Sequence, residues 1–488
     1  MFVPPEQFNI SDHFLDDRLA EGRGDRIALR VGDRAYSYRE VSELSNGFGE
    51  ALRKAGVRQE ERVILALSDG VEFAAALFGV LKIGAVGVMI NPDLGAEDTR
   101  YFEDYSRARA AVVDAVGHHR ATTLIARDVR PQPDLEKART HRDDPALWIF
   151  SGGTTGQPKA AVQSHRSFAN TAECYGRSFL GYRENDVTLS VPKLYFGYAT
   201  GSNLFFPFLV GATTCLFPER STPEVVFEQI RVHRPTLLIN VPTLILKMVS
   251  HPEADRQDLS CLRLVTSAGE ALPPSLYNRW KETFGVELID GLGTAEMWHI
   301  FLSNRPGEVR PGTLGKPVPG FEVKVADEDG RELPPGEVGR MWVRGMSRAI
   351  GYWQRMEESM EVFRGPWYRS GDLMMRDQEG CFTYCGRSDD MMKVGGKWLA
   401  PVEVESCLLK HPAVKECALV GISRDGLTRP CAFVVAADPT PALAAQLQAF
   451  VLEHLEPYKH PREVILLEAM PRTHLGKIDR NALRESLQ

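Results

Sequence analysis

The sequence predicts an α/β protein with a large N-terminal domain of layered, parallel-rich sheets, a β region, and a small α+β C-terminal domain. Three observations lead to this prediction. Helical patterns alternate with apolar strand-like runs in the first part of the chain, hydrophobicity alternates every second residue from about Gly312, and a short mixture of helix and strand follows residue 388. The length of 488 residues is too great for one hydrophobic core, so we expect at least two domains.

The N-terminal part shows the alternation of helix and strand. The helical stretch "REVSELSNGFGEALRKAGV" precedes the apolar runs "RVILAL" and "AVGVMI", and the alternation returns in residues 224–242 and 261–270. Such alternation indicates largely parallel sheets. The apolar stretch from Phe73 to Ile90 is interrupted by Lys82 and Gly84. We therefore expect a buried helix up to Ile83, a glycine cap and a short buried strand rather than a membrane span.

The second half changes character twice. Residues 321–345 alternate with period two around the turn signals Asp329-Gly330 and Pro334-Pro335-Gly336, which predicts antiparallel strands that continue through residues 368–392. After the polar run 387–390, the pattern predicts a helix within 401–412, a strand within 416–422 and a helix within 441–455. The predicted domains are residues 1–388 and 389–488.

The amino-acid composition argues against several classes of function. The net charge of -7 argues against a nucleic-acid groove, and 43% hydrophobic with 25% charged residues is an ordinary globular composition. The first residues lack the basic start and apolar run of a signal peptide, so we expect a cytoplasmic protein with no membrane contact. The eight cysteines are scattered, and Cys381 and Cys385 have no partner pair at metal-binding spacing, which predicts reduced cysteines.

The stretch "FSGGTTGQPK" is the most distinctive local feature. Glycine amides can form an anion-binding concavity, to which the threonine hydroxyls and Lys159 add donors and a positive charge. The nucleotide P-loop pattern does not fit, because no serine or threonine follows Lys159. By itself the stretch is interpreted either as a phosphate-binding loop or as a flexible surface turn.

Six separated motifs together favour the phosphate-binding loop over the surface turn: "SGGTTGQPK", "SAGEALP", "DGLGTAE", "YRSGDL", "GRSDDMMKVGG" and "PRTHLGKIDR". In this order and spacing, the chain resembles the adenylate-forming superfamily of acyl- and aryl-CoA synthetases, luciferases and peptide-synthetase adenylation domains. The stretches "DGLGTAEMWHIFLSN" and "VPKLYFGYATGSNLFFPFLVGATT" are most similar to benzoate-CoA ligases and related aryl-CoA ligases.

The resemblance implies an AMP-forming acid–thiol ligase. A carboxylate attacks the α-phosphate of ATP to give an acyl adenylate and pyrophosphate, and a thiol then displaces AMP. The implied cofactors are ATP, Mg²⁺ and coenzyme A, and the implied partner is a small aromatic acid, with the phosphopantetheine of a carrier protein as the alternative acceptor. We expect a monomer or homodimer that binds no nucleic acid. Two alternative hypotheses from other functional classes are a luciferase-type monooxygenase and a regulatory pseudoenzyme.

The resemblance also implies the roles of individual residues. Lys477 and Glu296 are the catalytic residues, with Glu296 as the magnesium ligand. Asp389 is the hinge of a C-terminal domain that moves between two orientations. The thiol channel is lined by Lys393, Gly395 and Gly396. The implied ATP-binding residues are Ser151, Gly152, Gly153, Thr154, Thr155, Gly156, Lys159, Gly269, Glu270, Asp290, Gly291, Leu292, Gly293, Thr294, Ala295, Asp372 and Arg387.

The acid-binding pocket is predicted from residue type. Residues 193–203 contain no aspartate or glutamate for an amino-acid ammonium group, and their aromatic side chains suit a flat ring. The candidates are Tyr195, Phe196, Tyr198, His299 and Ile300. Each aromatic side chain could instead be core packing, and His299 could be structural.

Three departures from the family pattern concern the nucleotide site. Gly152 stands where serine is usual, Ala295 where threonine is usual, and Leu292 where an adenine-stacking aromatic residue is common. They bear on the reaction rate and on nucleotide affinity, while the reaction class stays the same.

Overall fold

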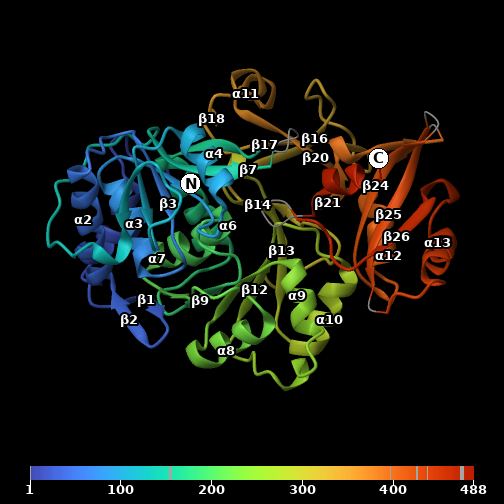
Figure 1. Cartoon of the computed structure of the whole chain (residues 1–488), viewed down its shortest axis with the longest axis horizontal. Coiled ribbons are helices and arrows are strands. Elements are labelled where there is room, and N and C mark those ends of the chain that lie inside the picture. Colours follow the sequence, from blue (N-terminus) through green and yellow to red (C-terminus); the bar gives the residue numbers. More distant parts are fainter. Residues whose placement is uncertain are drawn as a thin grey trace. The chain divides into compact units, whose positions relative to one another are not determined.

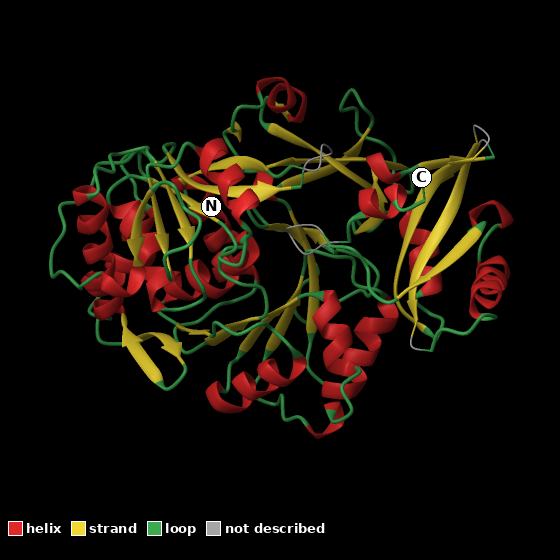
Figure 2. Ribbon diagram, in the orientation of Figure 1, coloured by secondary structure: helices red, strands yellow, loops and turns green. Residues whose placement is uncertain are grey.

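The computed structural model describes residues 2–152, 157–395, 397–424, 427–436, 438–472 and 478–487. The chain divides into two compact units, one comprising Met1–Val323 and Val343–Tyr368 and the other Lys324–Trp342 and Arg369–Gln488. Each unit is described by itself. Two large, mainly parallel sheets with helices beside them confirm the predicted α/β class (Figures 1 and 2). The predicted division after residue 388 stays a prediction.

The larger sheet of the first unit is parallel in its interior and antiparallel at both edges. The successive pairs from β13 through β12, β11, β9 and β10 to β1 are parallel, whereas β2 pairs antiparallel with β1, β14 with β13, and β15 with β14. Its nine strands are, in spatial order, β15 (Lys316–Pro317), β14 (Ile300–Ser303), β13 (Leu288–Gly293), β12 (Leu264–Ser267), β11 (Leu237–Asn240), β9 (Val187–Ser190), β10 (Thr213–Leu216), β1 (Ile27–Val31) and β2 (Arg34–Ser37).

The second sheet of this unit follows the same plan. Its β4, β3, β5 and β6 are parallel, and β8 joins β7 and β18 in antiparallel pairs. Its seven strands are β18 (Gly351–Tyr352), β8 (Lys159–Ser164), β7 (Pro145–Ser151), β4 (Val86–Met89), β3 (Arg62–Ala66), β5 (Ala110–Val113) and β6 (Thr122–Ile125).

Helices α2 (Tyr38–Lys54) and α3 (Val71–Lys82) pack on each other beside this sheet (Figure 1). A capping box starts α2, in which Ser37 and Glu40 satisfy each other's backbone amides. At Gly79 a β-carbon would lie 2.7 Å from the backbone oxygen of Ser45, so only glycine allows this close approach. Gly84 ends the helix with a φ of 69° before β4, as predicted.

The other helices of the first unit surround the two sheets. Apolar side chains of α8, α9 and α10 form a core with the larger sheet in which Trp280 is fully buried. The remaining elements are α1 (Asp17–Ala20), α4 (Ala96–Ser106), α5 (His165–Thr171), α6 (Gly197–Thr200), α7 (Phe206–Val210), α8 (Pro223–His233), α9 (Pro242–Val249), α10 (Pro274–Phe284), α11 (Met356–Val362), β19 (Phe363–Arg364) and the short helical turns η1 (Asp12–Asp16), η2 (Ala126–Asp128), η3 (Ala172–Phe179), η4 (Gly201–Phe205), η5 (Ala254–Arg256) and η6 (Ala295–Met297).

Three strands contain residues of both units: β16 (Glu322–Ala326), β17 (Val338–Arg344) and β20 (Trp367–Arg376). In the second unit, β24, β25 and β26 form a sheet that packs against α12 and α13 through an apolar core. The other elements of this unit are β21 (Phe382–Arg387), η7 (Ser388–Asp390), β22 (Met392–Val394), β23 (Lys397–Leu399), α12 (Pro401–Leu408), β24 (Val414–Arg424), β25 (Leu427–Ala436), α13 (Leu443–His454), η8 (Pro457–Lys459), β26 (Glu463–Leu467) and α14 (Arg480–Glu485).

Two expectations from composition concern the whole chain. All eight cysteines are free thiols. Among the described residues, no helix is both long and apolar enough to cross a membrane.

Candidate active site

A hairpin of the seven-stranded sheet carries the glycine-rich stretch. β7 ends at Ser151 and β8 begins at Lys159, and these two residues are paired in register, so the segment between them closes a loop. A β-carbon on Gly152 would meet no atom within 4 Å. The glycine is therefore not required there by crowding, and a serine would fit. Residues 153–156 of the predicted phosphate loop, including Thr154 and Thr155, lie outside the described residues.

The carboxylate of Glu296 is buried and is held by three hydroxyl groups. The hydroxyl of Tyr352 donates to Oε1 at 2.6 Å, Ser151 Oγ donates to the same oxygen at 3.1 Å, and the hydroxyl of Tyr368 donates to Oε2 at 3.1 Å. The backbone oxygen of Glu296 accepts from the amide of Ala349 at 2.7 Å. Residues of three strands, β7, β18 and β20, thus orient one carboxylate, which leaves it little rotational freedom.

The backbone after Glu296 is strained. Trp298 has a φ of 62° and a ψ of -51°, and the amide of His299 donates to the oxygen of Met297 at 2.8 Å, which makes a γ-turn of the rare, strained type. A β-carbon on Gly293 would lie 2.5 Å from the carbonyl oxygen of His299, so β13 can approach this turn only with glycine. The turn sends Glu296 and His299 in different directions from a short segment.

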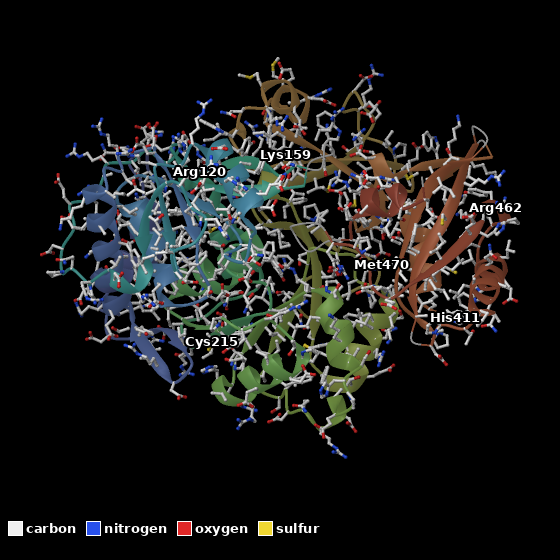
Figure 3. The ribbon with its side chains drawn as sticks, in the orientation of Figure 1. Arg120, Lys159, Cys215, His411, Arg462 and Met470 are labelled. Carbon is white, nitrogen blue, oxygen red and sulfur yellow. The ribbon has the colours of Figure 1, made fainter. Side chains whose placement is uncertain are left out.

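Lys159, labelled in Figure 3, is the first residue of β8 and contacts Tyr352. Its ammonium group lies 4.1 Å from the centre of the Tyr352 ring, and it forms an ion pair with Glu358 of α11. Tyr352 therefore contacts both Glu296, through its hydroxyl, and Lys159, through its ring. A cation over an aromatic ring is stabilised by the ring quadrupole.

The strip of predicted ATP-binding residues between Gly269 and Ala295 contains unsatisfied polar atoms. Among the described residues, Asp290 Oδ1 and Thr294 Oγ1 are buried without a hydrogen-bond partner. Burial raises the pKa of Asp290 to about 8. Gly269 has a φ of 90°, which favours glycine, and Glu270 beside it is exposed and accepts from the hydroxyl of Thr243 at 2.6 Å. Buried groups without partners suit a site that a polar ligand completes.

Three further members of the predicted strip belong to η6 and β13. A β-carbon on Gly291 would lie 2.9 Å from the side chain of Ile300, which explains a second glycine in this strand. Leu292 is half-buried. Ala295 is half-buried too and packs against a small apolar cluster that includes Ala161 and Tyr352.

The second unit brings together Asp372 and Arg387, two of the residues predicted to bind ATP. Asp372 of β20 pairs in register with Arg387 of β21, and Arg387 Nη1 lies 3.5 Å from Asp372 Oδ1. Ser370 Oγ donates to Asp372 Oδ2 at 2.5 Å. Asp372 is buried, so its orientation is set by these contacts. That Asp372 and Arg387 are cross-strand neighbours can be predicted only once the register of the hairpin is known.

The predicted hinge and thiol channel also lie in the second unit. Asp389 is in η7, where its Oδ2 lies 3.8 Å from Arg387 Nη2, while the next residue, Asp390, pairs with Arg484 at 3.1 Å. Lys393 and Gly395 belong to the β22–β23 hairpin, and Gly395 has a φ of 57° at the turn. Gly396 and Lys477 lie outside the described residues.

Two of the predicted pocket residues, Tyr198 and His299, contact each other. His299 Nε2 lies 3.1 Å from Tyr198 O and 3.1 Å from Ser202 Oγ, and the Tyr198 hydroxyl lies 2.7 Å from Thr266 Oγ1. Burial lowers the pKa of His299 to about 3, so its imidazole is neutral at pH 7. These contacts account for Nε2, whereas Nδ1 is buried without a hydrogen-bond partner among the described residues.

The other pocket candidates differ in burial. Tyr195 and Phe196 are half-buried, with ring centres 4.4 Å apart, and burial raises the pKa of Tyr195 to about 12. Ile300 is buried at the start of β14. Of the half-buried aromatic side chains, Tyr198 lies next to the neutral His299, and such a surface suits an uncharged ring.

Sequence reasoning did not assign a role to Tyr352 or Tyr368, although both touch the Glu296 carboxylate. Tyr368 is the first residue of the quoted motif "YRSGDL", and Tyr352 follows a glycine in "IGYWQ". A tyrosine on a strand is usually interpreted as packing. Only the fold shows that these two hydroxyls converge on one carboxylate.

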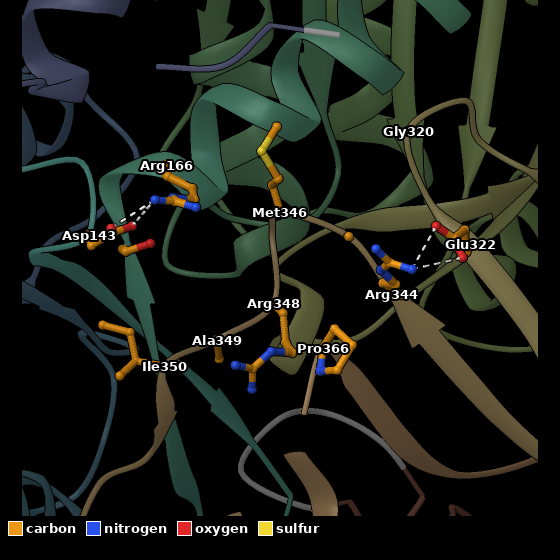
Figure 4. A pocket seen from close by; sticks show the side chains of 12 residues that line it. Asp143, Arg166, Gly320, Glu322, Arg344, Met346, Arg348, Ala349, Ile350 and Pro366 are labelled. Carbon is orange, nitrogen blue, oxygen red and sulfur yellow. Dashed lines mark hydrogen bonds and ion pairs between the residues drawn. The ribbon is translucent and has the colours of Figure 1, made fainter. Parts of the chain in front are cut away.

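A separate cavity of about 570 Å³ lies in the first unit (Figure 4). Its charged side chains are largely paired, Asp143 with Arg166 at 2.6 Å and Glu322 with Arg344 at 3.4 Å. None of the predicted site residues lines it, and Arg348 at its floor lies over the Phe363 ring at 5.3 Å. The cavity is therefore not the predicted nucleotide or acid site.

Comparison with known proteins agrees with this geometry. The family described as "AMP-binding enzyme" matches residues 16–353, and the family described as "AMP-binding enzyme C-terminal domain" matches residues 403–477. The chain belongs to the AMP-binding enzyme family. This confirms the resemblance inferred from the six motifs.

Among curated relatives, the chain is similar to a "Benzoate--CoA ligase" of Thauera aromatica, with 40% identity over 99% of this chain and 97% of that protein. It is also similar to a "4-hydroxybenzoate--CoA/benzoate--CoA ligase" of Rhodopseudomonas palustris, with 38% identity over 99% of this chain and 95% of that protein. The likeness to aryl-CoA ligases thus extends over the full length of the chain.

Solved structures give the same result. A crystal structure of the anthranilate CoA ligase AuaEII in complex with anthranoyl-AMP has a TM-score of 0.92 and 38% identity, covering 99% of this chain and 98% of that one. A benzoate CoA ligase from Burkholderia xenovorans LB400 has a TM-score of 0.89 and 38% identity, covering 98% of this chain and all of that one. The likeness confirms the fold class over both family regions.

The residues present fit a magnesium ion that arrives with a nucleotide. Among the described residues, no group of three histidine, cysteine or carboxylate side chains could hold a metal unaided. Mg²⁺ in nucleotide sites is usually held by one or two carboxylates together with substrate phosphates and water. The single oriented carboxylate of Glu296 matches the protein part of this donor set.

Proposed function

We propose that the protein is an AMP-forming ligase that joins an aromatic carboxylic acid to coenzyme A with the cleavage of ATP to AMP and pyrophosphate. The observation that carries the proposal is the buried carboxylate of Glu296, which accepts hydrogen bonds from three hydroxyl groups. It lies beside the β7–β8 hairpin, in which Lys159 is the first residue of the second strand. The full-length likeness to aryl-CoA ligases supports the same chemistry.

In the first half-reaction, a carboxylate oxygen of the acid attacks the α-phosphorus of ATP. The bond from this phosphorus to the bridging oxygen breaks, and pyrophosphate leaves with the electron pair. Because negative charge gathers on the phosphates, the protein contributes mainly by positioning and charge stabilisation. Lys159 would hold the β- and γ-phosphates with the glycine-rich loop. Mg²⁺ held by Glu296 and the phosphates would neutralise part of the charge.

The nucleoside would be held by the strip from Gly269 to Ala295 and by the β20–β21 hairpin. Asp290 and Thr294 bring buried polar atoms that lack a partner, which suits the edge of a purine. Asp372 and Arg387 would bind the ribose hydroxyls, since a buried carboxylate with its orientation fixed accepts from both hydroxyls. The remaining members of the predicted ATP-binding set would line the same site.

The aromatic acid would lie against Tyr198 and His299, with Tyr195, Phe196 and Ile300 as further walls. The neutral imidazole of His299, whose Nε2–H faces the carbonyl oxygen of Tyr198, can accept a hydrogen bond at Nδ1 but carries no charge at pH 7. An uncharged aromatic wall favours a ring over an ammonium group. We therefore propose benzoate and its uncharged ring derivatives as the substrate class.

The second half-reaction uses the C-terminal domain. In it the sulfur of coenzyme A attacks the acyl carbon, the bond to the phosphate oxygen breaks, and AMP leaves. We propose that residues 389–488 move about Asp389, so that Lys477 is presented during adenylation and the segment with Lys393, Gly395 and Gly396 during thiol transfer. The family resemblance supports these roles.

Benzoate-like acids are expected to promote exchange of labelled pyrophosphate into ATP in the absence of any thiol. Exchange reports only reversible adenylate formation, so it isolates the first half-reaction. The measurement is a panel of benzoate, hydroxybenzoates, aminobenzoate, an aliphatic acid and an α-amino acid, each at equal concentration with Mg²⁺. Aromatic acids should give the highest rates.

The same panel identifies the acceptor. Adding coenzyme A or a phosphopantetheinylated carrier protein should produce AMP with aryl-CoA in the first case and little acylated carrier in the second. Preferential acylation of the carrier would replace coenzyme A as the proposed acceptor. Folded protein that exchanges pyrophosphate with none of the acids would refute the proposed function as a whole.

Replacing Asp389 by proline is expected to permit adenylation and to slow thioester formation at least tenfold. Proline holds φ near -65°, and a domain rotation through this residue requires its backbone torsions to change. Rapid-quench measurement of both half-reactions checks this expectation. Asp389→Ala is the matched control, because it removes the same carboxylate but leaves the backbone free. Equal thioester rates in the proline and alanine variants would place the pivot elsewhere.

A further inference from the structure

We propose that Tyr352 is a positioning residue that holds the metal-binding carboxylate of Glu296 with its hydroxyl and the phosphate-binding ammonium of Lys159 with its ring. This inference rests on the proposed function, because it takes Glu296 as the magnesium ligand and Lys159 as a phosphate contact. Tyr352 itself would touch neither substrate nor metal.

The hydroxyl contact is the shortest of the three that reach this carboxylate. Tyr352 donates to Oε1 at 2.6 Å, against 3.1 Å for Ser151 and for Tyr368. A phenol can donate one hydrogen bond, and Tyr352 donates it to Glu296. Charge-assisted hydrogen bonds of this length are the strong ones. Tyr352 therefore contributes most to fixing the orientation of the carboxylate.

The three donors divide unequally between the two carboxylate oxygens. Oε1 accepts from both Tyr352 and Ser151, while Oε2 accepts only from Tyr368 among the described residues. A carboxylate offers about two acceptor positions on each oxygen. Oε1 is thus saturated, and Oε2 keeps one position. The geometry points to Oε2 of Glu296 as the oxygen available to a cation.

The backbone position of Tyr352 explains its contact with Lys159. Tyr352 lies on β18 and pairs in register with Ala161 of β8, two residues after Lys159. The ring is anchored by this pairing and by its packing on Phe363, and the Lys159 ammonium lies 4.1 Å from the ring centre. A flexible lysine would otherwise lose more conformational freedom on binding phosphate. The ring keeps it near the loop before the nucleotide arrives.

The test separates the hydroxyl from the ring. Tyr352→Phe removes only the hydroxyl, and Tyr352→Leu removes both. The first probe is Mn²⁺ with α,β-methylene ATP, followed by electron paramagnetic resonance, which needs no turnover. Tyr352→Phe should weaken Mn²⁺ binding to the nucleotide complex about tenfold, as expected for loss of a group that orients a metal ligand. The second probe is tripolyphosphate without divalent cations, which Tyr352→Leu should bind about threefold more weakly than Tyr352→Phe.

A matched control is available in Tyr38→Phe. The hydroxyl of Tyr38 is buried and donates to the oxygen of Ala212, also at 2.6 Å, but no predicted site residue is involved. This variant should lose thermal stability comparable to that lost by Tyr352→Phe and should bind Mn²⁺ like the wild type. Weakened Mn²⁺ binding in Tyr38→Phe would show a general loss of structure and overturn the assignment.

Two further outcomes distinguish this inference from the proposed function. Wild-type protein that binds the Mn²⁺–nucleotide complex, together with Tyr352→Phe of equal affinity, would overturn the role of the hydroxyl only. Wild-type protein that binds no such complex would overturn the metal role of Glu296 and the proposed function with it. Equal tripolyphosphate affinity in the leucine and phenylalanine variants would overturn the role of the ring.

Discussion

Replacing Lys477 by alanine is expected to slow adenylation about 10²–10³-fold and to leave thioester formation from presynthesised adenylate nearly unchanged. The resemblance of "PRTHLGKIDR" to the family motif motivates this prediction. The lysine ammonium would neutralise charge only while the α-phosphate is being attacked, so its loss should affect one half-reaction. Single-turnover measurements of each half-reaction, started with ATP and acid or with the acyl adenylate, provide the test.

Lys410→Ala is the control for this variant. Lys410 is an exposed lysine of the same C-terminal part, next to the end of α12, and its removal changes the net charge by the same amount. Its half-reactions should match the wild type. If Lys477→Ala slowed both half-reactions equally, the lysine would act on the structure of the domain and not on the adenylation step.

Replacing Glu296 by glutamine is expected to lower the rate of pyrophosphate exchange about 10²–10³-fold and to raise the Mg²⁺ concentration needed for half-maximal exchange. The amide keeps the shape of the side chain but removes the negative charge, and an amide nitrogen in the Oε2 position cannot accept from Tyr368. The measurement is exchange over a Mg²⁺ titration, with the folding of the variant checked by thermal unfolding.

Glu358→Gln serves as the comparison for charge. Glu358 pairs with Lys159 and lies in the same region, but among the described residues the three hydroxyls that orient Glu296 donate to Glu296 and not to Glu358. This variant should keep the wild-type Mg²⁺ dependence. A Glu296→Gln enzyme with an unchanged Mg²⁺ requirement would mean that another group binds the metal.

Much of the fold was predictable because local patterns agree with it. The helix up to Ile83, the glycine cap at Gly84 and the strand that follows were read from periodicity, and the structure has α3, a left-handed glycine and β4 at those places. In the C-terminal part, α12, β24 and α13 were predicted in the same way, whereas β25, β26 and α14 were not. The order of strands within each sheet was not predictable, because pairing depends on contacts between residues far apart in the chain.

The candidate site was likewise only partly predictable from the sequence. The motifs predicted Ser151, Lys159 and Glu296 as members of one site. In the structure Ser151 donates a hydrogen bond to Glu296, and Lys159 lies over the ring of Tyr352. The motifs did not indicate Tyr352 or Tyr368, because a tyrosine on a strand gives no local sign of what its hydroxyl will meet. The strained turn at Trp298 was likewise invisible in the sequence.

The sequence by itself determined the reaction class, because its six motifs stand in the order and spacing of the adenylate-forming superfamily, and the chain belongs to the AMP-binding enzyme family. It also determined the α/β architecture, because hydrophobic periodicity is a local property of the chain. Only the tertiary structure decided how the carboxylate of Glu296 is oriented and which oxygen remains free. That orientation arises from hydroxyls on β7, β18 and β20, which folding alone brings to one point.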